Sequence, residues 1–224
     1  MFETEAPMTK SARTKARISA AAVESFTERG YAETTMRLIA EKAGVSAGNA
    51  YYYFPSKDHL VQELYRRVQE EHATAARAAL SGERGLVDRL RLVLESGLST
   101  LTPYQRSAAG FLTAMIPPDS PINPLSAESA EARAITIGLF REAIDGAQHR
   151  LPADVAALLP EALFVGYLAL VLRWTYDTSP SHEQTTRLLD AGLRLLSVAL
   201  PFVRVPGLHR ATMQLLTLIA EVRS

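Results

Sequence analysis

The chain has 224 residues, of which 47% are hydrophobic and 21% charged, so it can bury a core large enough for one large domain or two modest ones. Its 24 Lys and Arg residues balance 24 Asp and Glu residues, so the total charge does not indicate nucleic acid, a membrane surface or an acidic partner. Because there is no cysteine, a disulfide framework, a cysteine-ligated metal site and a thiol nucleophile are all excluded.

Targeting signals are not evident in the sequence. The first 17 residues contain no apolar segment of the kind that a secretory signal needs. The longest apolar run, Ala162 to Leu172, is bounded by Glu161 and Arg173 and is too short to span a bilayer. We therefore expect a soluble, cytoplasmic protein with no membrane partner.

Counting charge by segment reveals an asymmetry that the neutral total conceals. Residues 10–57 hold eight basic and four acidic side chains, a net charge of +4, and all four lysines lie before residue 58. A short segment can carry such an excess by chance. It becomes informative only if a nucleic-acid-binding motif lies in the same stretch.

Apolar residues recur at helical spacing along almost the whole chain, and no alternating β-branched run occurs. Glycine, proline and N-capping residues divide this pattern into segments. Pro160 and Pro201 lie within two of them and should each start, kink or end a helix. We predict an all-α fold with helices over residues 10–29, 35–43, 46–54, 57–80, 86–101, 104–116, 126–150, 154–177, 182–203 and 207–222.

The first three predicted helices have the spacing of a helix-turn-helix. Gly44 permits the left-handed backbone that the turn between the second and third helices needs, and Ala40 is small enough for these helices to cross closely. The third helix begins with small polar residues and continues with three adjacent tyrosines. Since successive helical residues are turned by about 100°, the three tyrosines cannot all face one core.

The stretch from residue 26 to residue 60 resembles the TetR family of bacterial transcriptional repressors. The resemblance lies in an aromatic and glycine closing the first helix, a Thr-rich cap, an Ile-Ala pair, a Gly-Val-Ser-x-Gly turn, and a Tyr-x-x-Phe-x-Ser-Lys end. In this sequence these are Phe26, Gly30, Tyr31, Thr34, Thr35, Ile39, Ala40, Gly44 to Gly48, Tyr51, Phe54, Ser56 and Lys57. Ala50 departs from the pattern, because the family usually has a larger aliphatic residue there.

The resemblance implies an N-terminal helix-turn-helix domain followed by a C-terminal helical domain that binds a ligand and dimerises. We expect a disordered tail over residues 1–9, the DNA-binding domain over 10–57, a connecting helix over 58–80, and the ligand-binding and dimerisation domain over 81–224.

An enzymatic interpretation has little support in the sequence. Residues 44–48 match the G-x-S-x-G pattern of α/β-hydrolases, but that pattern needs a strand before the serine, and here a helix precedes it. The five histidines show no metal-ligand spacing, and no phosphate-binding glycine motif is present. We predict no catalytic residue, no metal site and no cofactor.

A helix-turn-helix reads bases with the start of its third helix, and contacts to phosphates position it. For phosphates we predict the capping hydroxyls and their neighbours, and the resemblance implies the same: Thr35, Ser46, Tyr51 and Lys57. For bases we predict Arg37, Asn49 and Tyr52, with Ala47 and Gly48 allowing close approach. Arg37 equally fits a solvated charge, and Lys10, Lys15 and Arg17 fit either ordinary surface charges or a basic arm on flanking phosphates.

In the C-terminal domain the resemblance implies a dimer formed through the last long helices, within residues 160–203, with Leu196 on the interface. It also implies an effector cavity enclosed by the middle helices. For its lining we nominate the aromatic residues, a methionine and two arginines as polar anchors: Tyr104, Phe111, Met115, Phe140, Arg141, Phe164, Tyr167, Arg173 and Trp174. A plain helical core would explain the same apolar residues.

The sequence thus predicts a homodimeric repressor that binds a palindromic operator in double-stranded DNA and is released by a small-molecule effector. An activator of the same fold, or a regulator that responds to a protein partner, would have the same sequence features. A helical ligand carrier or enzyme with an inert helix-turn-helix is the alternative from another class.

Overall fold

The structure, a computed structural model, describes residues 9–221, and no strand occurs among them. The predicted all-α fold is confirmed. Of the predicted tail, only Thr9 lies within the described residues, where its side chain caps α1. The α-helices are α1 (Lys10–Glu33), α2 (Met36–Lys42), α3 (Ala47–Tyr53), α4 (Lys57–Leu80), α5 (Leu86–Leu101), α6 (Gln105–Met115), α7 (Ala130–Asp145), α8 (Ala153–Thr175), α9 (Glu183–Ala199) and α10 (Pro206–Glu221).

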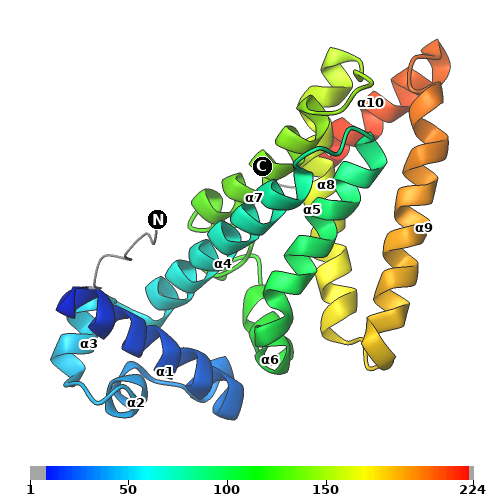
Figure 1. Ribbon diagram of the computed structural model, residues 1–224. Helices are drawn as coiled ribbons and strands as arrows, with labels where there is room; N and C mark the ends of the chain where they lie inside the picture. The colour runs from blue at the N-terminus through cyan, green and yellow to red at the C-terminus, as the bar shows by residue number, and fades with distance from the viewer. Residues whose placement is uncertain (1–8, 222–224) are drawn as a thin grey trace, which may run out of the picture.

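Helices α1, α2 and α3 form a small unit, here called the head, at one end of the molecule (Figure 1). Its core consists of fully buried apolar side chains, among them Ile18, Phe26, Ile39 and Phe54. Gly30 has a φ of +81°, so the regular helical path of α1 is interrupted where the sequence predicted its end.

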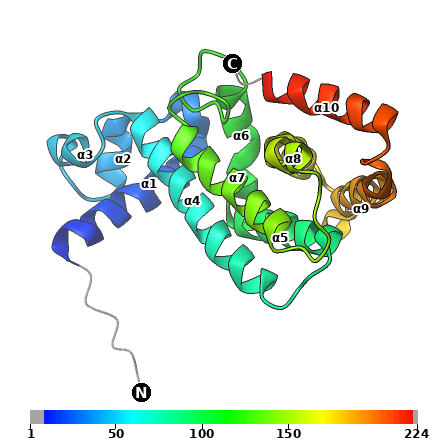
Figure 2. The ribbon, with the colours of Figure 1, turned by 90° about the horizontal axis from the view of Figure 1, so that it is seen from above.

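Helix α4 leaves the head and continues into a larger C-terminal bundle. In the view from above, α8 is seen almost end-on, with α5, α6, α7, α9 and α10 arranged around it (Figure 2). The main core of the bundle lies between α4, α5, α7 and α8 and contains Leu90, Leu139, Phe140 and Phe164. A second, smaller apolar cluster joins α10 to α8 through Leu216 and Leu159.

Several predicted boundaries need correction. The helix predicted over 126–150 is α7 and covers only Ala130–Asp145, because the residues before it form consecutive turns. The helix predicted over 182–203 ends at Ala199, and Pro201 lies in the 3-10 turn that follows. Pro160 neither starts nor ends a helix, since α8 runs through it.

Arg89 is a buried residue that joins three helices. Its guanidinium donates to the carbonyl oxygens of Leu80 and Glu83, at and just after the end of α4, and of Glu142 and Ala143, at the end of α7. The last carbonyls of a helix have no partner within it, so a buried cation that donates to them stabilises both ends. Only 8% of Arg89 is exposed.

By length and composition, α8 is the one helix in the described part of the chain that could cross a membrane. A third of its most apolar window is buried within the monomer, and α7 and α10 both pack against it. The apolar character of α8 is that of a central helix in a helical domain.

Candidate nucleic-acid interface

The turn between α2 and α3 is built around Gly44, which has a φ of +64°. This left-handed conformation is accessible to glycine without a steric penalty. The guanidinium of Arg17, reaching from α1, donates to the carbonyl oxygens of Ala43 and, at 3.2 Å, of Gly44. Arg17 therefore holds the end of α2 in place, so its side chain already has a role inside the head.

Hydroxyl side chains cap three successive helices, as the sequence predicted. The Oγ atoms of Thr35, Ser46 and Ser56 accept hydrogen bonds from backbone N–H groups of α2, α3 and α4. Thr35 and Ser46 are exposed, so the unpaired N–H groups of the first turns of α2 and α3 face solvent beside them. Such helix starts favour an anion such as phosphate.

Helix α3 has one buried side and one exposed side. Ala50 is fully buried against the head core, and Phe54 caps the helix from within. The small side chain at position 50 lets α3 approach the core closely, which accounts for the departure from the family pattern. The outward side carries the predicted base-reading and neighbouring residues Ala47, Gly48, Asn49, Tyr51 and Tyr52, all of them exposed.

Tyr52 is the most exposed large side chain on this surface, with 80% of it accessible. The rings of Tyr52 and Tyr53 form an edge-to-face pair with 5.3 Å between their centroids. The hydroxyl of Tyr53 donates a hydrogen bond to the hydroxyl of Ser11 on α1. The three tyrosines therefore diverge, as the helical geometry requires, and Tyr51 is half exposed. Because 80% of Tyr52 is accessible, its ring contributes little to the packing of the head and can contact a partner.

Lys57 is less free than the sequence suggested. Its ammonium donates to the carbonyl oxygens of Tyr31 at 2.6 Å and Thr34 at 3.0 Å, and it lies over the Tyr31 ring. Partial burial lowers the pKa of Lys57, against the charges of Asp58 and Glu33. One of its three N–H bonds is left for a further acceptor. The main contacts of Lys57 in this structure are therefore with the carbonyl oxygens at the end of α1.

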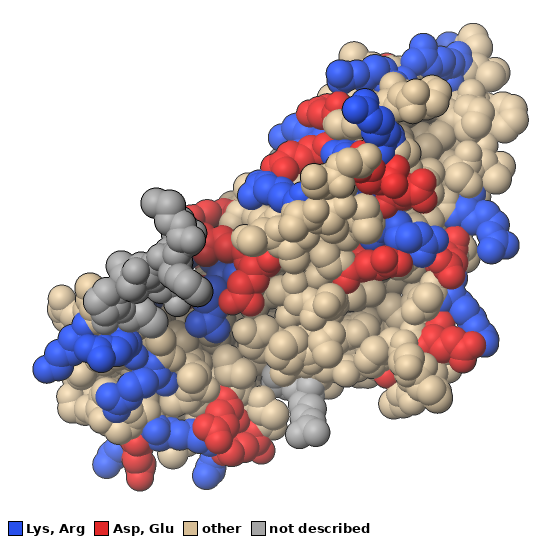
Figure 3. Space-filling model, in the orientation of Figure 1, with Lys and Arg blue, Asp and Glu red and all other residues tan. Residues whose placement is uncertain are grey.

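Other basic residues of the head are also engaged within the protein. Lys15 pairs with Glu63 of α4 at 2.6 Å, and Lys42 pairs with Glu28 at 2.7 Å. Arg37 is exposed near the start of α2. Figure 3 shows Lys and Arg atoms gathered at the end of the head where α1 begins and α3 lies.

Helix α6 packs on the head rather than lining a cavity in the bundle. The ring of Phe111 lies 5.0 Å from that of Phe26 and 6.2 Å from that of Tyr31. Met115 and the buried Ile122 belong to the same cluster. Phe111 and Met115, which the sequence nominated for the lining of an effector cavity, form a joint between the head and the bundle in this structure.

Two family profiles match this architecture. The profile described as bacterial regulatory proteins of the tetR family matches residues 18–64, and the profile described as the tetracyclin repressor-like C-terminal domain matches residues 89–201. The chain belongs to the TetR family. The resemblance inferred from the helix-turn-helix is confirmed, and the second match extends it over half of the chain.

Individual relatives of this TetR-family chain agree with the profiles. The HTH-type transcriptional regulator TtgR of Pseudomonas putida is 46% identical over 68 residues, 30% of this chain and 32% of TtgR. The HTH-type transcriptional repressor KstR of Mycolicibacterium smegmatis is 43% identical over 67 residues, 30% of this chain and 33% of KstR. The chain thus spans about a third of the length of the curated relatives that it matches.

A solved structure resembles nearly the whole fold. The crystal structure of a tetR-family bacterial regulatory protein from Rhodococcus has a TM-score of 0.58 and 25% sequence identity, covering 84% of this chain and 97% of that one. The matches to the curated relatives are therefore short, whereas the similarity of folds extends through the bundle.

The residues nominated for an effector cavity lie in different surroundings. Phe140, Phe164, Tyr167 and Trp174 are buried in the bundle. Arg141, nominated as a polar anchor, is exposed on α7. Arg173 donates to the side chain of Gln184, and Tyr104 lies partly buried in the 3-10 turn before α6.

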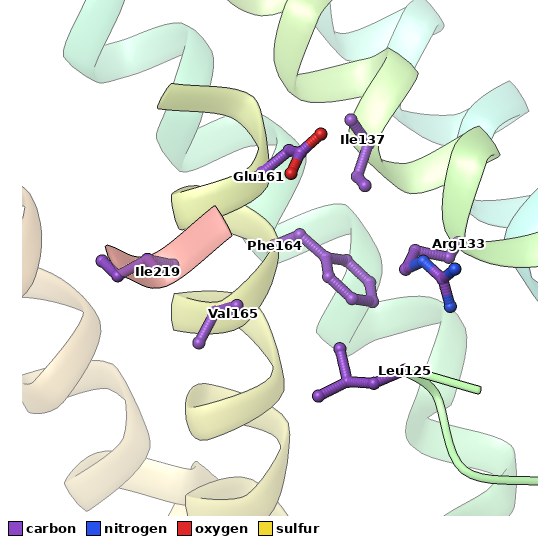
Figure 4. Close-up of a pocket in the computed structure, with 7 residues that line it drawn as sticks. All are labelled: Leu125, Arg133, Ile137, Glu161, Phe164, Val165 and Ile219. Carbon is purple, nitrogen blue, oxygen red and sulfur yellow. The ribbon is translucent and has the colours of Figure 1, made fainter. Parts of the chain in front are cut away.

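A small pocket lies between α7, α8 and the second half of the 117–129 loop, with α10 at its edge (Figure 4). Its volume is about 10 Å³, space for roughly one water molecule. Phe164 is the one nominated residue that lines it. The others are Leu125, Arg133, Ile137, Glu161, Val165 and Ile219.

Arg133, which the sequence reasoning missed, is the buried arginine of α7. It is 8% exposed, and its guanidinium donates to the carbonyl oxygens of Pro124 and Ser126 at 2.8 Å each. Helical spacing in the sequence could have identified Arg133 as a residue that faces the core. Arg133 lies seven residues before Phe140, two turns along the same helix face, whereas Arg141 follows Phe140 directly and is turned by about 100° from it.

The outer sides of the last helices carry apolar side chains that nothing in the monomer covers. On α9, Leu195 is 71% exposed and Val198 is 61% exposed. Leu196, predicted for the interface, instead packs partly buried against the core of the bundle. Further exposed apolar residues continue onto the neighbouring segments: Leu172, Leu188, Phe202, Val205, Leu208, Leu215 and Leu218.

Proposed function

We propose that this chain is a DNA-binding transcriptional regulator whose helix α3 enters the major groove of duplex DNA. The observation that carries the proposal is the outward side of α3, where Asn49 and the 80%-exposed Tyr52 project from a helix that is rigidly capped and packed from behind. In a helix-turn-helix this surface faces the bases.

Each exposed side chain of this surface has a matching role. Asn49 can donate to and accept from adenine, Arg37 can donate twice to guanine, and the Tyr52 ring can contact a thymine methyl. Phosphates would be bound by the helix starts at Thr35 and Ser46, with Tyr51 and the remaining N–H of Lys57 beside them. Ala47 and Gly48, both exposed, allow the backbone to approach the groove.

We further propose that the regulator is a homodimer. Large apolar side chains are exposed on both α9 and α10, and exposed apolar patches mark sites of protein–protein contact. A second copy would cover them by a two-fold axis, and the same axis would present two copies of α3 to the half-sites of a palindromic operator.

A small-molecule effector and a repressing role complete the proposal. The relative KstR is named as a transcriptional repressor, which supports repression as the sign of regulation. An effector would favour a state in which the two α3 helices are wrongly spaced for the operator. Helix α6 can transmit such a change, because Phe111 packs directly on Phe26 of the head. The protein would act in the cytoplasm, and no reaction is assigned to it.

The experiment is selection of binding sites from random duplex DNA with the full chain. We expect enrichment of a palindrome whose half-sites are centred about one helical turn apart. The variant Asn49→Ala should lose the preference at one position of each half-site while enriching the rest of the palindrome. Failure of the wild type to enrich any sequence would overturn the proposal.

A further inference from the structure

The interior of the bundle contains a cluster of polar side chains that the proposed DNA contacts do not use. His72 of α4 is 1% exposed, and Tyr167 of α8 is 4% exposed. Their rings lie 5.8 Å apart. One turn before His72, Gln69 accepts a hydrogen bond of 2.5 Å from Thr136 of α7. Buried polar groups are costly unless they are paired, so each needs an explanation.

The hydrogen bonding of His72 fixes its tautomer. Its Nε2 lies 2.8 Å from the carbonyl oxygen of Val93 on α5. A carbonyl can only accept, so Nε2 carries the hydrogen. Burial lowers the pKa of His72, which favours the neutral ring. In a neutral ring with the hydrogen on Nε2, the other nitrogen is a bare acceptor.

That acceptor, Nδ1, has no hydrogen-bond partner among the described residues, although it is fully buried. On α5 the residue next to the ring is Gly97, which has no side chain that could donate to Nδ1. A methyl group at position 97 would lie 2.9 Å from Cε1 of His72 and 2.6 Å from the hydroxyl of Tyr167. The glycine thus lets the imidazole and the phenol pack directly against the backbone of α5, where an aliphatic side chain would not fit.

Aromatic side chains that contact one another extend from His72 toward the pocket of Figure 4. Tyr167 lies against Phe140, with 6.4 Å between ring centroids. Phe164 is one turn before Tyr167 on α8, and Ile137 is one turn before Phe140 on α7. Phe164 and Ile137 both line the pocket, as Figure 4 shows. The pocket is therefore the outer end of a layer of aromatic side chains whose inner end is His72.

We propose that the effector is a neutral, mainly apolar molecule with one O–H group, an alcohol or a phenol, whose hydroxyl donates to Nδ1 of His72. The inference rests on the proposed function, since it names the ligand class of the effector site. The apolar part of the molecule would displace Phe164 and Tyr167 from their close packing, so the ligand selects an opened conformation of this layer.

The chemistry of the acceptor Nδ1 excludes other classes of ligand. A carboxylate would direct lone pairs at the lone pair of Nδ1, and an ether would do the same. A hydrocarbon would leave Nδ1 unpaired in a buried site. Only a donor removes the unsatisfied acceptor, and a hydroxyl does so at the lowest cost of desolvation among common donors that are not charged.

Three probes that differ in one group test the proposal: 4-propylphenol, its methyl ether, and 4-propylbenzoate. Their dissociation constants are measured by calorimetry without DNA. We expect the phenol to bind about tenfold more tightly than the ether, the effect of one buried hydrogen bond, and the benzoate to bind most weakly. Equal binding of phenol and ether, or no binding of the phenol, would overturn the proposal.

Substitutions test whether His72 is the residue that gives the preference for the phenol over the ether. His72→Leu should abolish the preference for the phenol over the ether, whereas His72→Gln, whose amide can donate to Val93 and still offer an oxygen, should retain part of it. The matched control is His149→Leu, because His149 is exposed after α7 and should leave the preference unchanged.

If His72→Leu does not fold, nitrogen-15 correlation spectra of the wild type provide the same test. Without probe they should show the tautomer with the hydrogen on Nε2, and the phenol alone should shift the Nδ1 resonance. An unchanged resonance in the presence of bound phenol would contradict the proposal. Release of DNA is measured separately, so a protein that binds the phenol at His72 but never binds DNA would refute the proposed function and leave the ligand site intact.

Discussion

The head and the C-terminal bundle use their cationic and polar side chains differently. In the head, Arg17 and Lys57 tie helix ends together near the surface, and the side chains that remain exposed on α3 lie on one side of it. In the bundle, Arg89 and His72 are buried and their contacts are internal. The function proposed for the head therefore depends on its surface, and the function proposed for the bundle depends on its interior and its last helices.

The largest expected effect tests this contrast through two arginines that both donate to helix-end carbonyls. Arg89→Met removes a buried donor from four carbonyl oxygens and should lower the free energy of unfolding by about 3 kcal/mol. Arg17→Met removes an exposed donor, and water can replace it, so the loss should be below about 1 kcal/mol. Urea unfolding followed by circular dichroism measures both. Equal losses would show that burial does not separate the two sites.

The next effect uses two adjacent residues of α9. Leu195→Glu places a charge on the uncovered face, so the chain should stay helical, sediment as a monomer and bind the palindrome about 100-fold more weakly, because two linked half-site contacts become one. Leu196→Glu places the charge against the bundle core and should lower the melting temperature instead. A wild-type chain that sediments as a monomer at micromolar concentration would refute the proposed dimer.

A smaller effect sharpens the account of the α3 surface. Asn49→Ala removes a side chain that contributes nothing to the head core, so the melting temperature should stay unchanged while the affinity for the selected palindrome falls by about 1–3 kcal/mol. The matched control is Glu41→Ala, an exposed position at the end of α2. Fluorescence anisotropy with labelled duplex provides the affinities. An equal loss on cognate and random duplex would assign Asn49 to the backbone instead of a base.

The smallest effect concerns phosphate contacts. Lys57→Met should reduce the slope of log affinity against log salt by about one, and equally for all sequences. It should also lower the free energy of unfolding slightly, because the hydrogen bonds to the carbonyl oxygens of Tyr31 and Thr34 are lost.

Lys10→Met, at the exposed start of α1, tests whether the basic arm contacts flanking phosphates. A slope that Lys57→Met leaves unchanged would confine Lys57 to its structural role.

The two regions also differ in how far sequence alone could predict them. In the head, Gly44, Thr35 and Ser46 have functions that follow from local backbone geometry, and each is found in its predicted conformation. In the bundle, the helices were predicted, but not which side of each faces the core. Leu196, nominated for the interface, packs against the core, and Arg141, nominated as an anchor, is exposed, since one residue of rotational error moves a side chain by about 100°.

Long-range contacts account for the rest of what the sequence could not show. Phe111 looked like a residue of the bundle, but its partners in the head are about 80 residues earlier in the chain. Arg89 was not singled out, because its four acceptors are backbone carbonyls that come together only in the folded bundle. The unpaired Nδ1 of His72 likewise follows from tertiary structure.

The most direct test of the central claim, that the surface of α3 reads DNA sequence, is the affinity of the full chain for the selected palindrome and for a scrambled duplex over a range of salt concentrations. We predict at least about 10³-fold tighter binding to the palindrome at physiological salt, with steep salt dependence for both duplexes. Equal affinities for the two duplexes at every salt concentration would contradict the claim, because they would show only nonspecific attraction between a basic head and phosphate.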